Sequence, residues 1–423
     1  MTRADLVIRD CAELLTCRGP LPKRKDALRD CGSIENGWIA SLQGRIVFAG
    51  SEPEFRNEVV AGDETEWIDG RNLIALPGFV DSHTHLPFAG DRVHEFGLRL
   101  QGWTYTQLAE QGMGIRTTVE ATRAVSRDEL AGLCLKRLDR MLLQGATTVE
   151  AKSGYGLNFD DEIKQLEVLA EVNRLHPIDV VPTFMGAHDI PAEYRDRTDA
   201  YLDFLIDRLM PAVQVRRLAD FFDVFCERGV FSLEETRRLV EAAQRAGFGI
   251  KIHSDEFTAL GATELAAEVG AVSAEHLIEI TPDGIRALAG SPTVALLLPG
   301  VPFFLMLDKR PPARDLIDAG AALALGSDFN PGSSMVSSML FILQLGVFTL
   351  RLTVEEAINA CTANAACAVG RQAEIGSLEP GKKMDVILCE VPSCAHLVYE
   401  LGPNPVRHVV KNGRLVVRDG RRV

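Results

Sequence analysis

Residues 77–85 read PGFVDSHTH, and this stretch decides the fold. A Pro-Gly break precedes a short apolar run, and the run ends in two histidines separated by one threonine. Side chains two residues apart on a strand point to the same side, so His83 and His85 present two imidazoles together. Because this strand also opens a series of similar strands, the pair predicts half of a metal site.

Seven more apolar runs of strand length follow, and helical patterns lie between them. Three helical segments begin with a capping box, a hydroxyl residue followed three positions later by glutamate, at Ser126, Ser232 and Thr353. Alternating strands and helices imply a parallel sheet, and eight such units fit a (β/α)8 TIM barrel of about 250 residues. A doubly wound open sheet is the alternative, but no G-x-G-x-x-G fingerprint or P-loop sequence supports it. The eight runs are 79–85, 146–152, 179–188, 221–227, 249–254, 271–277, 293–299 and 321–328.

The two chain ends differ from the middle because their apolar runs are short and alternate with polar residues. An Asn412-Gly413 turn between residues 407–411 and 414–418 is a strong hairpin signal. Each end is too short to bury a core alone. We therefore expect residues 1–76 and 371–423 to form one small β-sandwich domain beside a catalytic barrel over residues 77–370.

Composition limits the compartment and the partners. The chain has 423 residues, 46% of them hydrophobic, and a net charge of −14, so wholesale disorder, a nucleic-acid partner and an anionic membrane partner are disfavoured. Nine cysteines without a C-x-x-C pair, and no N-terminal signal sequence, favour the cytoplasm. The longest apolar run, residues 293–307, contains two prolines and is shorter than the ~20 residues of a membrane span.

Five of the nine histidines fall at predicted strand ends, where active sites of such barrels lie. In a closed barrel the eighth strand lies beside the first, so Asp328 can reach His83 and His85, with His253 across the mouth. Three imidazoles and one carboxylate suit one Zn²⁺ or Fe²⁺, which lowers the pKa of bound water to about 7. Taken alone, Asp328 is equally well explained as a helix N-cap.

Other residues near these strand ends have both a chemical and an ordinary structural explanation. Glu256 could protonate a leaving nitrogen or be a solvated loop carboxylate, and His276 could polarise a carbonyl or be a core histidine. Arg92 could hold a carboxylate with its planar fork or be a loop residue. Tyr155 could donate its hydroxyl to a substrate. Lys152 at the end of the second run is a weak candidate for a carbamylated, metal-bridging lysine.

Together these residues carry a resemblance to the amidohydrolase superfamily, and within it to the imidazolonepropionase family. The resemblance spans nearly the whole barrel, and SGYGL, GAH and DFNPGSS separate this family from related deaminases. The matching segments are PGFVDSHTHLPFAGDR (77–92), AKSGYGL (151–157), PTFMGAH (182–188), FCERG (225–229), KIHSDEF (251–257) and SDFNPGSS (327–334). Position 256 departs from many members, which have glutamine there.

The resemblance implies a fold, a reaction and a set of site residues. The fold is a TIM barrel with a small β-sandwich, and the reaction opens the ring of 4-imidazolone-5-propanoate to give N-formimidoyl-L-glutamate in histidine degradation. It implies one zinc or iron ion per chain, a small anionic substrate and a homodimer. The implied metal ligands are His83, His85, His253 and Asp328. The implied catalytic residues are Asp328, His276 and Glu256, and the implied substrate contacts are Arg92, Tyr155, His188, Glu256, Asn330, Gly332 and Ser333.

Two other functions remain open from the sequence. A related deaminase acting on a cytosine- or guanine-like ring would share the metal ligands, would not need Arg92 and would release ammonia. A metal-free binding or scaffold protein descended from such a barrel is disfavoured by the intact ligand set. Residues 338–350 are apolar nearly all round, so we expect them to be buried or at an interface.

Overall fold

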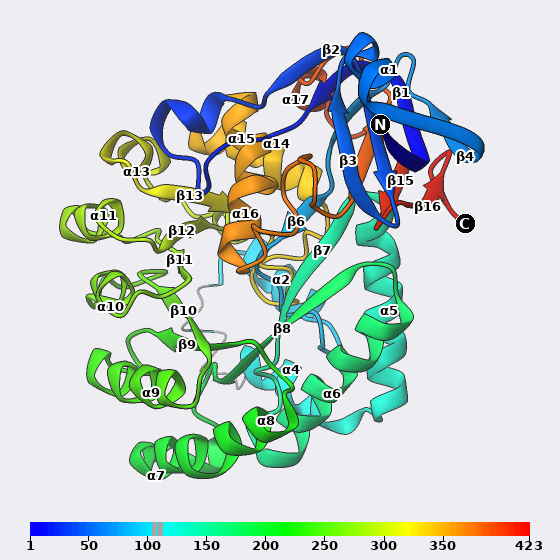
Figure 1. The fold of residues 1–423 in the computed structure, drawn as a ribbon. Helices are drawn as coiled ribbons and strands as arrows, with labels where there is room; N and C mark the ends of the chain where they lie inside the picture. Colours follow the sequence, from blue (N-terminus) through cyan, green and yellow to red (C-terminus); the bar gives the residue numbers. More distant parts are fainter. Residues whose placement is uncertain (104–106, 108–112) are drawn as a thin grey trace.

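The eight predicted strands form one parallel sheet around a central axis, which confirms the TIM-barrel prediction. The structure is a computed structural model and describes residues 1–103, 107 and 113–423. Each strand pairs with the next along the chain, and the helices lie outside (Figure 1). The strands are β6 (Phe79–Asp81), β7 (Ala146–Lys152), β8 (Asp179–Ala187), β9 (Phe221–Cys226), β10 (Gly249–Ser254), β11 (Ser273–His276), β12 (Val294–Leu297) and β13 (Ala322–Leu325).

The barrel closes just beyond the ends of its first and last strands. Thr84 and Phe329 form an isolated parallel bridge. The Asp328 amide donates to the His83 carbonyl at 2.9 Å, and the His85 amide donates to the Phe329 carbonyl at 3.0 Å. Three of the four predicted metal ligands, His83, His85 and Asp328, therefore lie in the two segments that close the barrel.

The helices begin where the sequence predicts caps. The hydroxyls of Ser126, Ser232 and Thr353 each accept a backbone N–H, and the paired glutamate returns to the cap amide. The barrel helices are α2 (Val93–Leu100), α4 (Ile115–Ala124), α5 (Arg127–Leu143), α6 (Phe159–Leu175), α7 (Thr198–Phe204), α8 (Met210–Arg216), α9 (Leu233–Arg245), α10 (Ala262–Glu268), α11 (Pro282–Ala289), α12 (Gly300–Phe304), α13 (Ala313–Ala319), α14 (Met339–Leu350), α15 (Val354–Cys361) and α16 (Ala363–Ala368). Short turns of other helix types are η1 (Lys25–Arg29), η2 (Ala192–Tyr194) and the π-helical η3 (Leu205–Leu209).

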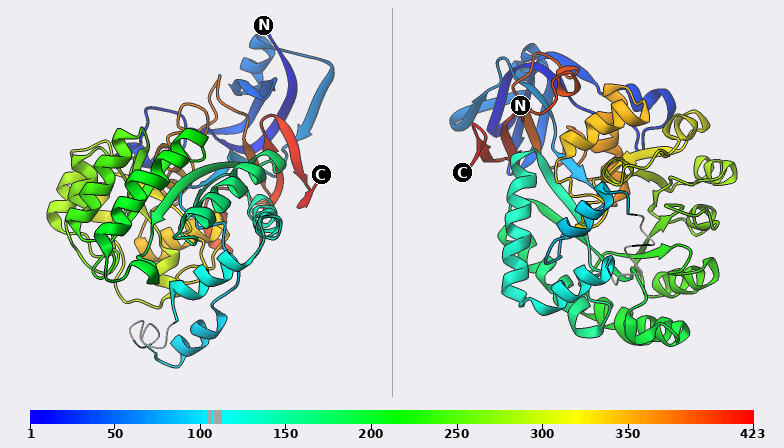
Figure 2. Two further views of the ribbon diagram at one scale, coloured as in Figure 1. Left: turned by 90° about the horizontal axis from the view of Figure 1, so that it is seen from below. Right: turned by 180° about the vertical axis from the view of Figure 1, so that it is seen from behind.

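Strands from both chain ends form a second sheet at one side of the barrel, where both termini lie (Figure 2). The long β1 pairs with β2, β4 and β5, and β14 pairs with β5, so hydrogen bonds join N-terminal and C-terminal strands directly. The expected two layers are thus connected as one continuous sheet. Its strands are β1 (Thr2–Leu15), β2 (Ser33–Leu42), β3 (Arg45–Gly50), β4 (Val59–Asp69), β5 (Ile74–Pro77), β14 (Val386–Cys389), β15 (Val406–Lys411), β16 (Arg414–Arg418) and β17 (Arg421–Arg422), with α1 (Glu52–Glu58) and α17 (His396–Tyr399) beside them.

Each sheet has its own apolar core. One cluster of buried side chains fills the space between the barrel strands and their helices, and a separate cluster packs on the terminal sheet. Two packed units are consistent with the predicted composite domain, although the exact division at residues 77 and 371 stays a prediction. In the described part of the chain, no helix is long and apolar enough to cross a membrane.

Candidate metal centre and active site

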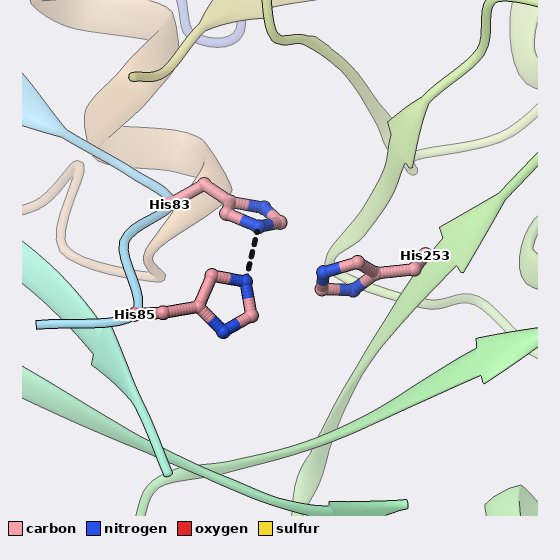
Figure 3. Close-up of side chains that lie close together, drawn as sticks. All are labelled: His83, His85 and His253. Atoms are coloured by element: carbon pink, nitrogen blue, oxygen red, sulfur yellow. Dashed lines mark hydrogen bonds between the residues drawn. The ribbon is translucent and has the colours of Figure 1, made fainter. Parts of the chain in front are cut away.

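Three imidazoles converge at the mouth of the barrel (Figure 3). His83 and His85 follow β6, and their Nε2 atoms are 3.4 Å apart. His253 comes from β10, and its ring centroid lies 4.6 Å from that of His83 and 5.5 Å from that of His85. All three side chains are buried, and one nitrogen from each lies within 4.8 Å of the others. The i, i+2 spacing therefore places the first two rings together, as predicted.

Asp328 completes this group from the loop after β13. Its Oδ1 lies 3.2 Å from His83 Nε2 and 3.3 Å from His85 Nε2. The residue has φ of 50°, a left-handed conformation that costs energy for a residue with a Cβ and often marks a functional site. The closure hydrogen bonds described above fix this turn. The structure thus brings the four predicted ligands together.

The chemistry of this donor set fits a divalent metal ion. His253 Nε2 is buried and has no hydrogen-bond partner within the described residues. Burial lowers the pKa of His253 well below its usual value, so its ring is neutral, as a ligand must be. Burial and the Lys152 ammonium oppose protonation of His83, but Glu275 and Asp328 raise its pKa to about 9. A proton and a metal ion therefore compete for this ring.

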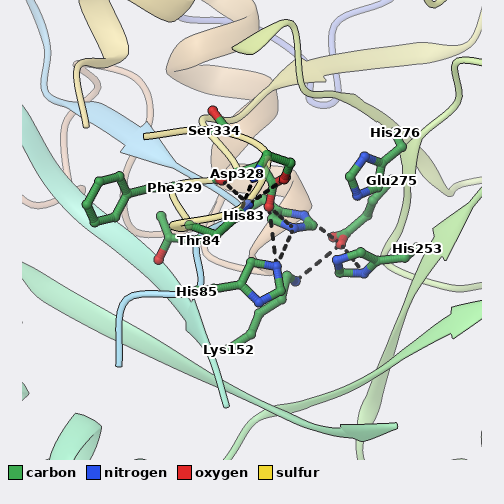
Figure 4. Close-up of polar contacts among 12 residues, drawn as sticks. His83, Thr84, His85, Lys152, His253, Glu275, His276, Asp328, Phe329 and Ser334 are labelled. Atoms are coloured by element: carbon green, nitrogen blue, oxygen red, sulfur yellow. Dashed lines mark hydrogen bonds and ion pairs between the residues drawn. The ribbon is translucent and has the colours of Figure 1, made fainter. Parts of the chain in front are cut away.

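Two carboxylates below the imidazoles orient them, and the sequence analysis did not predict either one. Glu275 Oε2 lies 2.7 Å from His83 Nδ1, and Asp223 Oδ1 lies 3.1 Å from His253 Nδ1 (Figure 4 shows Glu275). A carboxylate on the far ring nitrogen fixes the tautomer and leaves Nε2 free for a metal. The available signal was a single acid inside an otherwise apolar strand, as in FFDVFC for β9.

Lys152 lies among buried carboxylates at the end of β7. Its ammonium is 2.8 Å from Glu150 and from Asp223, and 3.2 Å from Glu275. Burial opposes the charge, but Asp223 and Glu150 hold the pKa of Lys152 above its usual value. A carbamate forms on a neutral amine, so this environment argues against the carbamylated-lysine hypothesis.

His276 and Glu256 lie beside the group formed by His83, His85 and His253. The His276 ring centroid is 4.9 Å from that of His253, and His276 Nδ1 is 3.6 Å from Glu256 Oε1. Burial lowers the pKa of His276 well below its usual value, so the ring is neutral. Burial, followed by Asp328 and Glu227, raises the pKa of Glu256 well above its usual value. A protonated Glu256 can donate a hydrogen bond.

A cavity of about 420 Å³ opens over these residues. Every residue that the sequence predicts to contact a substrate lines this cavity, and so do the metal-ligand candidates His85, His253 and Asp328. Arg99, near the end of α2, and Trp103, just beyond this helix, also line the cavity, and no sequence motif predicted either of them. The predicted contacts that line it are Arg92, Tyr155, His188, Glu256, Asn330, Gly332 and Ser333.

Arg92 reaches the cavity wall already paired to one acid. Glu95 accepts from its Nε at 2.8 Å and lies 2.6 Å from its Nη2, and Glu95 also accepts the Gly114 amide at 3.0 Å. The guanidinium packs against Gly332, where a Cβ would overlap it. Glycine at 332 therefore makes room for Arg92, and only the outer edge of its fork remains for a ligand.

The Asn330–Ser334 loop positions Asp328 as well as lining the cavity. Asn330 Oδ1 accepts the amides of Gly332 and Ser333 at 2.8 Å each, and Asn330 Nδ2 donates to the Asp328 carbonyl at 2.7 Å. The Ser333 hydroxyl donates to Asp328 Oδ2 at 3.1 Å. The second carboxylate oxygen of Asp328 is therefore occupied, and Oδ1 is left facing the imidazoles.

Tyr155 and His188 form the wall next to His85. The His188 ring stacks on His85 with centroids 4.7 Å apart, and the Tyr155 ring lies 5.8 Å from that of His85. Burial and then His85 lower the pKa of His188 to about 3, so it is neutral. The loop after β7 carries Tyr155, and the Gly154 carbonyl of this loop contacts His188 Nδ1 at 3.1 Å. This loop is held by Glu162, which no sequence motif predicted. Its carboxylate accepts the amides of Gly154, Gly156 and Leu157 at 3.1, 2.8 and 2.9 Å.

Solved structures with this fold include several hydrolases. An adenosine deaminase from Xanthomonas campestris with bound zinc is 19% identical, covers 100% of this chain and 95% of its own, and has a TM-score of 0.74. A triazine hydrolase variant is 17% identical, covers 99% of this chain and 96% of its own, and has a TM-score of 0.77. These likenesses support the fold alone. The amidohydrolase family matches residues 99–417, so fold, site and family together define an amidohydrolase.

Curated relatives narrow this class. The imidazolonepropionase of Symbiobacterium thermophilum is 49% identical over 100% of this chain and 99% of its own length. That of Alkaliphilus metalliredigens is 46% identical over 99% of each. The chain belongs to the imidazolonepropionase family, and it is a hydrolase.

Proposed function

We propose that this protein hydrolyses the ring of 4-imidazolone-5-propanoate to N-formimidoyl-L-glutamate, the third step of histidine degradation. The observation that carries the proposal is full-length identity of 43–49% to several relatives named imidazolonepropionase, with all the motif residues gathered in or beside one cavity. The deaminase alternative is less well supported, because the adenosine deaminase described above is 19% identical to this chain.

One divalent ion per chain, zinc or iron, would be held by His83, His85, His253 and Asp328. When bound, such an ion supplies a Lewis acid that activates water near neutral pH and polarises a carbonyl. His276 is a further nitrogen near this set, since one of its ring atoms lies within 4.8 Å of ligand atoms of His83 and Asp328. We assign it to the substrate carbonyl because it lines the cavity beside Glu256.

The chain's own residues account for the proton movements. Water oxygen bonds to the ring carbonyl carbon, the ring C–N bond breaks, and the carbonyl carbon becomes the α-carboxylate of the product. We assign the acceptance of the water proton to Asp328, whose Oδ1 faces the imidazoles. In the metal-free protein, His83 and His85 already hold the pKa of Asp328 well below its usual value despite its burial. The neutral His276 stabilises the developing oxyanion. Glu256, or a water that it orients, supplies the proton to the departing nitrogen.

The substrate carboxylate lies toward Arg92 and Tyr155 in this proposal. The free edge of Arg92 provides a charge-assisted hydrogen bond, and the guanidinium of Arg99 in the same cavity adds positive charge. With a net charge of −14, the chain needs such local cations to attract an anion.

Product analysis tests the function. The purified, metal-loaded protein is incubated with imidazolonepropionate, and the products are followed by NMR and an ammonia assay. Formation of formimidoylglutamate without ammonia supports the proposal. Ammonia release, with the ring carbon skeleton closed, would support the deaminase instead. Elemental analysis of the unaltered protein separates zinc from iron. Loss of turnover and of bound metal in His83→Ala and His253→Ala tests the assignment of the metal ligands.

The quaternary state and compartment belong to the same proposal. We propose a cytoplasmic homodimer. Helix α14 buries most of its apolar residues, but Phe348 is 55% exposed, and Tyr399 of α17 nearby is 81% exposed. Large apolar side chains exposed together suit a contact between two copies. Light scattering on the unaltered protein and on Phe348→Glu tests this: the variant should be monomeric if the contact lies there.

A further inference from the structure

The interior of the barrel beneath the imidazoles is filled by charged groups. Barrels of this type usually fill this space with branched apolar side chains. Here three acids and two lysines have 0% exposure: Glu150, Lys152, Asp223, Lys251 and Glu275. Burying an unpaired charge costs free energy, so each of these charged groups needs a partner of opposite charge within the cluster.

Lys152 is the centre of the pairing. Its ammonium contacts one oxygen from each of the three acids, at 2.8, 2.8 and 3.2 Å. The Asp223 carboxylate uses Oδ2 for Lys152 and Oδ1 for His253 Nδ1. Glu275 uses Oε2 for both Lys152 and His83 Nδ1. Two carboxylates thus connect the ammonium to two of the proposed metal ligands.

The same atoms would make a second cation site if the ammonium were absent. Three carboxylate oxygens, one each from Glu150, Asp223 and Glu275, converge on the place of the ammonium, and all three acids are buried. Carboxylate oxygens suit Mn²⁺. A fixed ammonium among these oxygens repels a second divalent ion strongly, because charge interactions are large where water is excluded.

We infer that Lys152 is a positioning residue of the metal centre: its ammonium occupies the place of a second cation between Glu150, Asp223 and Glu275, and so keeps the centre mononuclear. This inference rests on the proposed metal centre. Glu275 and Asp223 hold His83 and His253 by their far ring nitrogens. Lys152 in turn holds these acids in place.

Lys251 offers a matched control. It is equally buried and contacts the same Glu275, but through the other oxygen, Oε1, at 2.8 Å. Its ammonium also donates hydrogen bonds to Ser273 Oγ at 2.9 Å and the Ser82 carbonyl at 3.5 Å. Replacing Lys251 removes one buried positive charge from the cluster, as replacing Lys152 does, but opens no space beside Asp223.

The test is metal stoichiometry. Unaltered protein, Lys152→Ala and Lys251→Ala are stripped, reloaded with excess Mn²⁺, desalted, and measured by elemental analysis and electron paramagnetic resonance. We expect one ion per chain in the unaltered protein and in Lys251→Ala, and two ions with a spin-coupled signal in Lys152→Ala. One ion in Lys152→Ala, or two in both variants, would overturn the inference. An unaltered protein that binds none would overturn the proposed metal centre as well.

The unaltered protein provides a second measurement if circular dichroism shows that Lys152→Ala does not fold. A titration with Mn²⁺ far above saturation should stop at one buried ion per chain and show no spin-coupled pair. Uptake of a second, spin-coupled ion by the unaltered protein would show that Lys152 does not exclude it, and would overturn the inference.

Discussion

At the scale of single residues, the site depends on what each polar group already contacts. Glu256 is the clearest case, because its carboxyl lies 3.6 Å from the neutral His276 ring and its burial favours the protonated form. A protonated carboxyl and a glutamine amide both donate a hydrogen bond. Glutamine at this position in many family members is therefore compatible with the same contact.

Replacing Glu256 by glutamine should keep substantial activity. The amide preserves the donor, so we expect kcat to fall by less than about 100-fold if Glu256 mainly hydrogen-bonds the ring. Steady-state kinetics on Glu256→Gln measures this, and Glu256→Ala serves as the control that removes the donor. A fall of about 10⁴-fold in the glutamine variant would show instead that Glu256 is an essential proton donor.

Arg92 should discriminate substrates by their carboxylate. A hydrogen bond to a charged group contributes about 1.5–3 kcal/mol, so Arg92→Ala should lower kcat/KM by roughly 10- to 100-fold, chiefly through KM. Arg92→Lys should recover only part of this loss, since lysine lacks the planar fork and cannot reproduce the pairing with Glu95. Kinetics on an analogue without the propionate provides the contrast. An equal loss for both substrates would mean that Arg92 is structural.

At the scale of elements, the sequence was most informative about the strands. All eight apolar runs are strands of the barrel because a fully buried parallel strand leaves a continuous apolar signal. The loops were predicted from short motifs alone. Glu162 was missed because its partners are backbone amides, which carry no sequence signal. The pairing of Arg92 with Glu95 was missed because one helical turn places them together only after the loop is folded.

The loop after β7 should depend on Glu162. Removing its carboxylate leaves the buried amides of Gly154, Gly156 and Leu157 without that acceptor, and each lost partner costs about 1–3 kcal/mol. Glu162→Ala should therefore lower the free energy of unfolding by roughly 3 kcal/mol or more, and raise KM because Tyr155 and His188 lose their support. Denaturant unfolding and kinetics measure the two effects.

A cap variant provides the control for that experiment. Ser232→Ala removes the hydroxyl that accepts the Glu235 amide at the start of α9, a helix outside the cavity lining, and should cost about 1 kcal/mol of stability with little change in the kinetics. A Glu162→Ala protein as stable and as active as the unaltered one would contradict the role given to Glu162.

At the scale of the whole molecule, the closure of the barrel also assembles the proposed metal centre. The ligand set was predictable because strand order places the eighth strand beside the first. The charged interior was not predicted, because Lys152 and its acids lie in different strands and pair only when the barrel closes. The terminal sheet was predicted from both ends, but the single continuous sheet depends on β1 pairing with three strands, with register shifts along its length that composition does not reveal.

Metal affinity should depend on pH in a defined direction. Without metal, the pKa of His83 is about 9, so a proton occupies the ring at lower pH and must leave when metal binds. Raising the pH from 6 to 8 therefore weakens the competition from the proton, and apparent affinity should increase by about tenfold per pH unit and level off above the pKa. Competition titrations with a metal-binding dye measure this. A flat profile across this range would contradict the shared proton site.

The most direct test of the account is the position of the oxygen that comes from water. The reaction is run in H₂¹⁸O, and the product is analysed by mass spectrometry with fragmentation, beside a sample without protein. We expect one ¹⁸O atom in the α-carboxylate of formimidoylglutamate, because in the proposed reaction water adds to the ring carbonyl, which we assign to His276. Label at the carbon between the two ring nitrogens, or release of ammonia with the ring intact, would contradict it.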